Sequence, residues 1–337
     1  MNQNVLLSIV ILAAGKGTRM KSAQAKVLHN VFFRPMLHYV LQATQTLTPH
    51  RTVVIVGHQE QAVRESLTSY NVEIVKQEEQ LGTGHAVQMT QEAIPEDNGL
   101  VMILCGDTPL ISTSSLENML NRHIASGDDL TVMSTILDSP YGYGRIVSQG
   151  ANITAIVEEK EADSGQRKIK EINAGIYLVK RKLLFDALES ITPDNTQGEF
   201  YLTDIVQYAV SKGIAVKKYI NNKPIEVLGV NSRVELEAAH SQLQTQRNIE
   251  LMQQGITMQN IDTITISPFS EIGVDTLLMQ GVTIMGKSVV GQTCILENGA
   301  IIDNCIIGNN VHIGAYAVLR NQTIANNSEI EPLSYRK

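Results

Sequence analysis

The stretch Ile11-Leu12-Ala13-Ala14-Gly15-Lys16-Gly17-Thr18-Arg19-Met20 decides how the first half of this chain is read. It continues an apolar run, Val5 to Leu12, that predicts a buried β-strand. The small residues leave backbone N–H groups open, and N–H groups with cations beside them can hold a polyphosphate. Because position 20 is Met, the stretch matches neither a Walker loop nor the dinucleotide fingerprint. It therefore indicates a phosphate-binding loop of another kind.

Short apolar runs alternate with amphipathic segments through the first 230 residues, which predicts an α/β, Rossmann-like domain with a mostly parallel sheet. The expected strands are Val53–Val56, Val72–Val75, Leu100–Cys105 and Leu130–Thr135, and the expected helices are Met36–Leu47, His58–Leu67, His85–Ala93 and Ser114–Ile124. Ligands bind beyond the carboxyl ends of such strands, where loop 13–26 and Asp107 fall. Gly144–Val179 is expected to be an antiparallel insertion that forms a lid or wall. Its hairpin turns at Gln149-Gly150, and Ile169–Val179 is its last strand.

The last third has a six-residue period of aliphatic side chains. The members of this series are Ile272, Leu278, Ile284, Val290, Leu296 and Ile302, then Ile301, Ile307, Ile313 and Leu319, then Ile324 and Ile330. Such hexads predict a parallel β-helix, and roughly eleven of them would give between three and four coils. Residues 231–254 lack Gly and Pro and predict a connecting helix.

Composition narrows the class of protein. The formal charge is −7, which argues against a non-specific nucleic-acid binder, so any phosphate site must be a local cluster of cations. Asn2, Gln3 and Asn4 do not form the basic start of a signal peptide, and no run of 18 apolar residues predicts a membrane span. Three cysteines without C-x-x-C spacing fit free thiols, and we expect a cytoplasmic protein.

Several motifs recur in order along the chain. They are Leu12-Ala13-Ala14-Gly15, Gly17-Thr18-Arg19-Met20, Lys26-Val27-Leu28-His29, Gln80-Leu81-Gly82-Thr83-Gly84-His85-Ala86, Gly106-Asp107, Tyr143-Gly144-Arg145-Ile146, Glu171-Ile172-Asn173-Ala174-Gly175, Gly198-Glu199, Leu202-Thr203-Asp204 and Gly229-Val230-Asn231. With the hexapeptide tail, they resemble the uridyltransferase half of the bifunctional N-acetylglucosamine-1-phosphate uridyltransferase/glucosamine-1-phosphate acetyltransferase family. The resemblance covers nearly the whole chain. It implies a nucleotidyltransferase domain over 1–230, a connecting helix over 231–254 and a truncated left-handed β-helix over 255–337.

The resemblance implies transfer of uridylyl from UTP to N-acetylglucosamine 1-phosphate, with Mg²⁺ as cofactor and no covalent intermediate. Two anions must approach each other, and one unit charge pair at 4 Å is worth about 4 kcal/mol at an effective dielectric constant of 20. Arg19 and Lys26 are therefore the expected catalytic cations, although many such side chains are merely solvated. Lys16 is either solvated or a secondary phosphate contact.

The same resemblance assigns the remaining sites. Asp107 and Asn231 are the expected metal ligands, although Asn231 alone would be read as a helix N-cap. The expected nucleotide-binding residues are Leu12, Ala13, Ala14, Gly15, Gln77, Gly82 and Thr83. The expected sugar-binding residues are Gly144, Glu158 and Asn173, although Glu158 could also belong to a solvated acidic run with Glu159 and Glu161.

The chain departs from the family pattern at three places. Ala25 stands where the family usually has Pro, so the loop before Lys26 loses a fixed φ. Cys105 stands where the family usually has Tyr, which removes an aromatic ring from the nucleotide pocket. Because the later coils of the family carry acetyl transfer and are absent from this sequence, we expect no acetyltransferase activity.

Alternatives remain open. The resemblance implies a homotrimer, and it leaves open a related enzyme that uses another sugar 1-phosphate. It also leaves open a catalytically silent scaffold that binds a nucleotide sugar.

Overall fold

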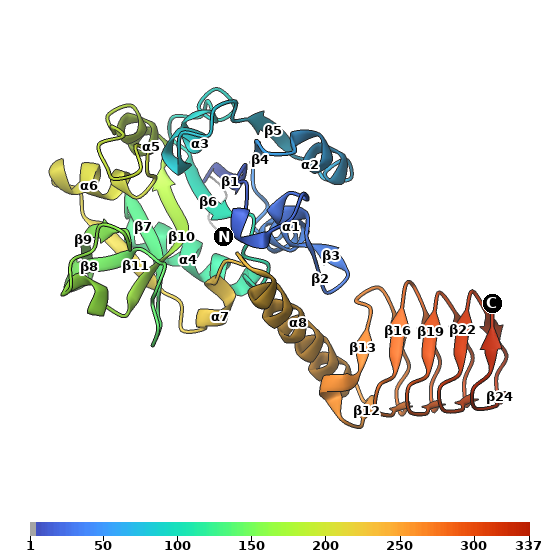
Figure 1. The fold of residues 1–337 in the computed structure, drawn as a ribbon. Coiled ribbons are helices and arrows are strands. Elements are labelled where there is room, and N and C mark those ends of the chain that lie inside the picture. Colours follow the sequence, from blue (N-terminus) through green and yellow to red (C-terminus); the bar gives the residue numbers. More distant parts are fainter. Residues whose placement is uncertain (1–4) are drawn as a thin grey trace. The chain divides into compact units, whose positions relative to one another are not determined.

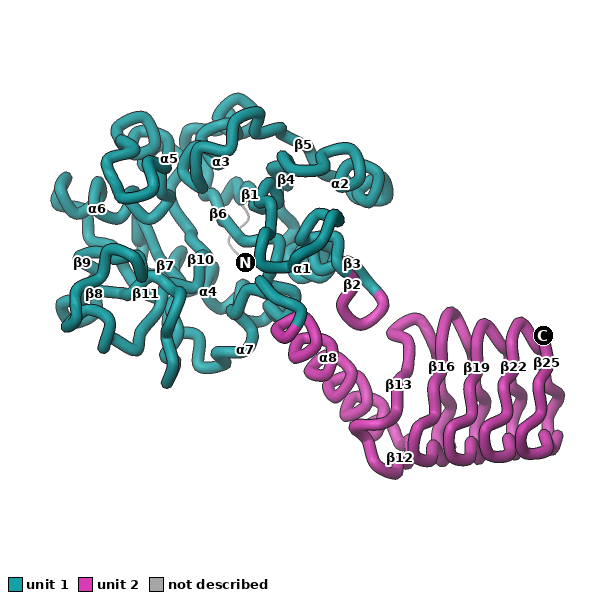
Figure 2. Tube along the Cα trace, viewed as in Figure 1, with its two compact units in different colours: residues 1–29, 34–233 teal, residues 30–33, 234–337 magenta. Residues whose placement is uncertain are grey.

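The computed structural model describes residues 5–337, so Asn2, Gln3 and Asn4, which bear on the signal-peptide question, lie outside the described residues. The chain divides into two compact units (Figure 2). The first comprises residues up to His29 together with Arg34–Arg233, and the second comprises Asn30–Phe33 with Val234–Lys337. The finer limits expected at 230 and 254 stay predictions.

The first unit is built on a nine-stranded mixed sheet in the order β5-β4-β1-β6-β10-β7-β11-β9-β8 (Figure 1). Its strands are β1 Leu7–Ala13, β4 Arg51–Val56, β5 Glu73–Lys76, β6 Leu100–Cys105, β7 Leu130–Ile136, β8 Arg145–Gln149, β9 Asn152–Val157, β10 Glu171–Lys180 and β11 Val216–Ile220. β1, β4, β5 and β6 run parallel, as the alternation of apolar runs and helices predicts. Two short strands, β2 Asn30–Val31 and β3 Arg34–Pro35, form a separate pair.

Helices cover both faces of this sheet. The helices are α1 Met36–Gln45, α2 Glu60–Ser66, α3 Thr83–Gln88, α4 Thr113–Ser126, α5 Arg181–Leu188, α6 Asp204–Ser211 and α7 Pro224–Val227, with 3₁₀ turns η1 Thr18–Met20, η2 Lys26–Leu28 and η3 Gln166–Lys168. Alternate residues of β1 enter different cores: Ile9 and Ile11 pack with α1 and α4, whereas Val10 packs with α3, α5 and α6. α3 ends at Gln88, earlier than the helix expected to reach Ala93.

The prediction that Ile169–Val179 belongs to a lid is wrong. These residues form β10, which lies in the middle of the sheet and pairs antiparallel with both β6 and β7. Its residues from Ile176 to Val179 are fully buried, as befits a strand covered on both faces. The expected hairpin at Gln149-Gly150 is confirmed, but β8 and β9 extend the edge of the main sheet instead of forming a separate layer.

The second unit contains α8, Arg233–Gln253 apart from its first residue, and a left-handed parallel β-helix. Its strands are β12 Thr257–Met258, β13 Thr265–Ile266, β14 Glu271–Ile272, β15 Leu277–Leu278, β16 Thr283–Met285, β17 Val289–Val290, β18 Ile295–Leu296, β19 Ile301–Asp303, β20 Ile306–Ile307, β21 His312–Ile313, β22 Val318–Arg320, β23 Thr323–Ile324, β24 Glu329–Ile330 and β25 Tyr335–Arg336, with η4 Ile261–Thr263. They form three parallel sheets of five, five and four strands within the described part of the chain.

The estimate of three to four coils is therefore too low. The 3₁₀ turn η4 separates β12 from β13 and interrupts the six-residue period there, so the first coil is hidden in the sequence.

A shortened corner explains the changes of hexad phase. Ile284 and Ile302 are buried at corresponding positions one coil apart, but the next buried isoleucine after Ile302 is Ile307, which ends the six-residue spacing. Asn304 and Asn321 occupy this corner with φ of 51° each, in the left-handed region that Asn tolerates better than most residues. The second series therefore starts at Ile307, and Ile301, which was assigned to it, is only partly buried.

Candidate active site

Loop 14–29 connects the end of β1 to β2 and carries most of the expected phosphate contacts. Gly17 has φ of 59°, and a Cβ added there would lie 2.6 Å from Lys26 Cβ. Only glycine fits such a conformation and such a close approach at once. Gly17 thus lets the loop fold over the side chain of Lys26.

Lys26 lies where three distant segments meet. Its Nζ forms an ion pair with the carboxylate of Asp107, which follows β6, and donates to Asn231 Oδ1 at 3.0 Å. The Val230 N–H donates to the Asp107 carbonyl oxygen at 2.8 Å, which joins the two acceptor segments. The Lys26 and Asp107 side chains are 15% and 16% exposed, so the pair is sheltered yet open at one side. The structure therefore brings one predicted cation together with both predicted metal ligands.

Arg19 and Lys16 lie differently from Lys26. Arg19 belongs to η1 and is exposed, and no residue among 5–337 forms a hydrogen bond or an ion pair with its side chain. Lys16 is also exposed, but it lines the pocket described next. Arg19 is not among the residues that line this pocket, so the structure does not bring it together with Lys26, Asp107 and Asn231.

A pocket of about 360 Å³ lies beside this loop. Its lining includes all the residues expected to bind nucleotide, namely Leu12, Ala13, Ala14, Gly15, Gln77, Gly82 and Thr83, together with Lys16, Lys26, Val27, Gln80, Ala86, Cys105, Asp107 and Glu199. Gln77 is buried and donates to the Gly82 carbonyl at 3.0 Å, so it is a fixed part of the wall and not a surface glutamine.

Two polar lining residues, Gln80 and Glu199, were not assigned a role from the sequence. Gln80 donates through Nε2 to the Ala14 carbonyl at 2.9 Å, which ties the far wall to the phosphate loop. Glu199 lines the same pocket. Both lie inside quoted motifs, but a motif does not show which of its side chains face the ligand. Cys105 also lines the pocket, and burial raises the pKa of its thiol to about 12, so it stays neutral.

The three expected sugar-binding residues also lie together. A Cβ on Gly144 would lie 3.3 Å from Glu158 Oε1, and the Asn173 N–H donates to the Gly144 carbonyl at 2.9 Å. Asn173 Nδ2 donates to the Tyr177 hydroxyl at 2.7 Å, and the Gly175 N–H donates to Asn173 Oδ1 at 3.0 Å. A carboxylate and an amide beside bare backbone can bind sugar hydroxyls.

Glu158 lies near two other acidic side chains, Glu161 and Asp204, and the sequence did not predict that Asp204 joins this group. Burial, followed by repulsion from Glu161 and Asp204, raises its pKa. Burial and the charge of Glu161 raise the pKa of Asp204 to about 6. Shifted carboxyl groups of this kind are enriched at functional sites.

We expect Asp204→Asn to stabilise the protein more at pH 8 than at pH 5. An Asp titrates near 3.9 when unfolded, so between that pH and about 6 the folded chain binds more protons, and its stability falls as the pH rises. The variant lacks this titration, so its advantage in free energy of unfolding should grow with pH. Urea unfolding at the two pH values measures it. Asp194→Asn, at an exposed position, is the control, and an advantage that shrinks at pH 8 would contradict the expectation.

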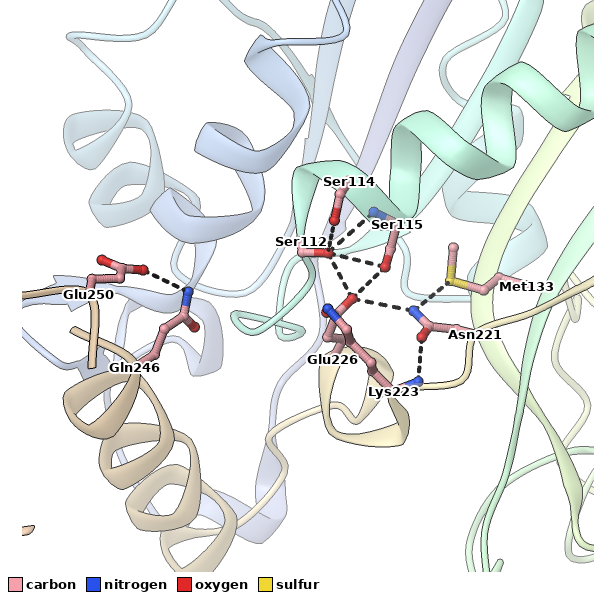
Figure 3. A network of polar contacts seen from close by, with 9 residues as sticks. All are labelled: Ser112, Ser114, Ser115, Met133, Asn221, Lys223, Glu226, Gln246 and Glu250. Carbon is pink, nitrogen blue, oxygen red and sulfur yellow. Dashed lines mark hydrogen bonds and ion pairs between the residues drawn. The ribbon is translucent and has the colours of Figure 1, made fainter. Parts of the chain in front are cut away.

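A buried carboxylate, that of Glu226, lies between the start of α4 and the segment around α7 (Figure 3). Glu226 of α7 is 7% exposed and accepts hydrogen bonds from Ser112 at 2.8 Å and from Ser115 at 2.5 Å. Asn221 donates to it at 3.4 Å and Lys223 pairs with it at 3.2 Å. Burial alone would raise the pKa of Glu226, but the hydrogen bonds from Ser115, Ser112, Lys223 and Asn221 together outweigh burial and lower it. Glu226 thereby joins the start of α4 to the segment that precedes Gly229-Val230-Asn231.

Glu226→Ala should lower the free energy of unfolding by about 3 kcal/mol at pH 7, because it leaves buried donors unsatisfied. A carboxyl group with a lowered pKa stabilises the fold above its unfolded pKa near 4.3, and this contribution disappears as the pH falls through the folded value. The difference between variant and parent should therefore narrow in acid. Denaturant titrations across pH measure it, with the exposed Glu92→Ala as control. A loss that stays constant down to pH 3 would speak against this account.

The donor set at Asp107 and Asn231 suits a hard cation. Both offer oxygen atoms, and both already converge on one positive charge, the ammonium of Lys26. Among residues 5–337, no group of three or more His, Cys, Asp and Glu side chains is placed to hold a metal. Mg²⁺ needs few protein ligands when phosphates supply the rest, so these two residues fit it.

Both parts of the chain match known protein families. The profile of the MobA-like NTP transferase domain family matches residues 9–201, and that of the bacterial transferase hexapeptide (six repeats) matches residues 287–321. A protein of Desulfotalea psychrophila named bifunctional protein GlmU is 50% identical, with 96% of each chain covered. Proteins of the same name from Caldanaerobacter subterraneus and Shouchella clausii are 40% and 39% identical, over 97% of this chain and 71% and 72% of theirs. Within residues 5–337, no helix is both long and apolar enough to cross a bilayer.

Proposed function

This chain belongs to the GlmU family, and we propose that it transfers uridylyl from UTP to N-acetylglucosamine 1-phosphate. The products are UDP-N-acetylglucosamine and pyrophosphate. The observation that carries the proposal is the meeting of Lys26, Asp107 and Asn231 beside a pocket lined by the phosphate loop. A cation and two oxygen donors that meet at the wall of a pocket with a glycine-containing loop suit phosphoryl chemistry.

The reaction needs no nucleophile from the protein. An oxygen of the sugar phosphate attacks the α-phosphorus of UTP, and the bond to the bridging oxygen of the β-phosphate breaks, so pyrophosphate takes the electron pair. The substrate oxygen is already an anion at pH 7, and the protein has to position two negative groups and offset their repulsion. In our proposal, Lys26 neutralises the α-phosphate as charge grows there, and Arg19 of the exposed turn η1 holds the departing pyrophosphate.

We propose Asp107 and Asn231 as the ligands of Mg²⁺. When bound, the ion would withdraw charge from the phosphate oxygens. Gly229 lets the backbone lie close to the Asp107 carboxylate, because a Cβ at position 229 would lie 3.3 Å from one of its oxygen atoms.

We assign the base and the sugar to two separate groups of residues. Gln77, Gly82 and Thr83 would read the uracil edge beside the backbone of residues 12–15, because an amide and open peptide groups supply paired donors and acceptors. Gly144, Glu158 and Asn173 would hold the sugar, with Gly144 leaving room for the N-acetyl group. The aromatic ring missing at Cys105 is not replaced by another aromatic residue among those lining the described pocket.

A pyrophosphate-release assay tests the function. Purified protein is mixed with UTP, Mg²⁺ and a panel of sugar 1-phosphates, and kcat/KM is compared. We expect the highest value with N-acetylglucosamine 1-phosphate. A higher value with another sugar 1-phosphate would reassign the substrate, and nucleotide-sugar binding without turnover would identify a silent scaffold.

Three further predictions concern the whole protein. Sedimentation at micromolar concentration should show a homotrimer, and a monomer would count against it. An assay with an acetyl donor and glucosamine 1-phosphate tests the expected lack of acetyl transfer. A cytoplasmic location is tested by fractionating cells that produce the chain.

A further inference from the structure

Gln59 lies at the start of α2 in an unfavourable backbone conformation. Its φ is 53° and its ψ is 42°, in the left-handed region that costs a residue with a side chain about 1 kcal/mol. A residue at this position commonly uses its side chain to cap its own helix, but Gln59 makes no such bond. Both polar atoms of its amide point elsewhere.

Those two atoms hold the loop that precedes Lys26. Gln59 Oε1 accepts from the Ala25 N–H at 2.9 Å, and Gln59 Nε2 donates to the Ala23 carbonyl oxygen. The side-chain amide thus pairs with a donor and an acceptor two residues apart, as a neighbouring strand would do. Ala25 is 1% exposed, and Lys26 begins η2 directly after it.

We infer that Gln59 is a positioning residue for Lys26. It fixes the segment 23–25, so that η2 starts where the lysine ammonium meets Asp107 and Asn231. Ala25 has φ of −54° and ψ of 134°, values that proline adopts without strain. Gln59 therefore holds from outside a conformation that a proline at 25 would hold from within. This inference rests on the proposed catalytic role of Lys26.

The test uses Gln59→Gly, which removes the clamp and relieves the backbone strain, so loss of folding does not confound it. Thr48→Gly is the matched control, because Thr48 also has a left-handed φ, 47°, and is exposed. Hydrogen exchange at the Ala25 amide should accelerate in Gln59→Gly and stay unchanged in Thr48→Gly. An unchanged exchange rate in Gln59→Gly would refute the clamp, whatever the enzyme does.

Activity then tests positioning. In Gln59→Gly, kcat should fall about tenfold while KM for UTP changes less than about twofold, because a misplaced catalytic group slows the chemical step more than it weakens binding. Adding Ala25→Pro should restore at least half of kcat. Faster exchange with an unchanged kcat, or a double variant as slow as the single one, would overturn the inference. A parent protein without uridylyl transfer would refute the proposed function and leave the exchange result standing.

Discussion

Lys26→Ala should lower kcat about a thousandfold and weaken UTP binding only a few-fold. The pyrophosphate-release assay under saturating substrate gives kcat, and calorimetry gives the dissociation constant of UTP. The physical reason is that Lys26 is proposed to act on charge that appears only as the α-phosphorus is attacked. Removing one such preorganised group from a sheltered site typically costs about 10²–10³ in rate. Binding of the ground state keeps the pocket walls and loses one contact among many.

The structure makes this variant interpretable. The Lys26 ammonium contacts Asp107 and Asn231, so truncation leaves two oxygen donors facing each other without their cation. The free energy of unfolding must therefore be measured beside the activity. Lys21→Gln, at an exposed position of the same loop, is the control for loss of a positive charge. Equal losses in kcat and in UTP affinity for Lys26→Ala would mean that the lysine only binds.

The sequence predicted local features well and long-range pairing less well. β6 matches its predicted limits, because an unbroken apolar run between polar segments shows where the strand begins and ends. The buried position of β10 was missed, since a run of apolar residues alternating with polar ones fits an edge hairpin as well as a central strand. Partner choice depends on residues far away in the sequence, such as Ile103 opposite Tyr177, and a single sequence does not reveal it.

The candidate site divides in the same way. The motifs identified residues in the walls of the pocket, because small residues and glycines indicate where the backbone turns or is left open. Gln59 and Glu226 escaped notice, because each looks like an ordinary polar residue beside a short helix. Their importance comes from contacts with Ala25, Ser112 and Ser115 across long stretches of chain. Supporting residues of this kind become visible only when the fold has brought their partners near.

Asp107→Ala should lower kcat/KM by at least a hundredfold at 1–2 mM Mg²⁺, as is typical when a group that orders charge at the reacting phosphate is lost. The variant loses a proposed metal ligand and also the carboxylate that pairs with Lys26. Asn231 still presents an oxygen in the same place, and Mg²⁺ binds largely through water and phosphate oxygens. We therefore expect part of the activity to return as Mg²⁺ is raised, with the midpoint of the titration shifted to higher concentration.

The Mg²⁺ titration separates the two effects of this substitution. If Asp107 served only to hold Lys26, added Mg²⁺ would recover nothing, because the lysine would stay without its partner. Asp97→Ala, at an exposed carboxylate that pairs with Arg181, removes the same charge away from the pocket and should titrate like the parent. If Asp107→Ala and the parent retained equal activity when both were assayed with a Mg²⁺ chelator, the ligand assignment would be refuted. Loss of the Asp97 charge changes the local Mg²⁺ concentration only within the screening length, about 8 Å at physiological salt. A midpoint that shifts in Asp107→Ala but not in Asp97→Ala would therefore show that the metal binds at the Asp107 carboxylate.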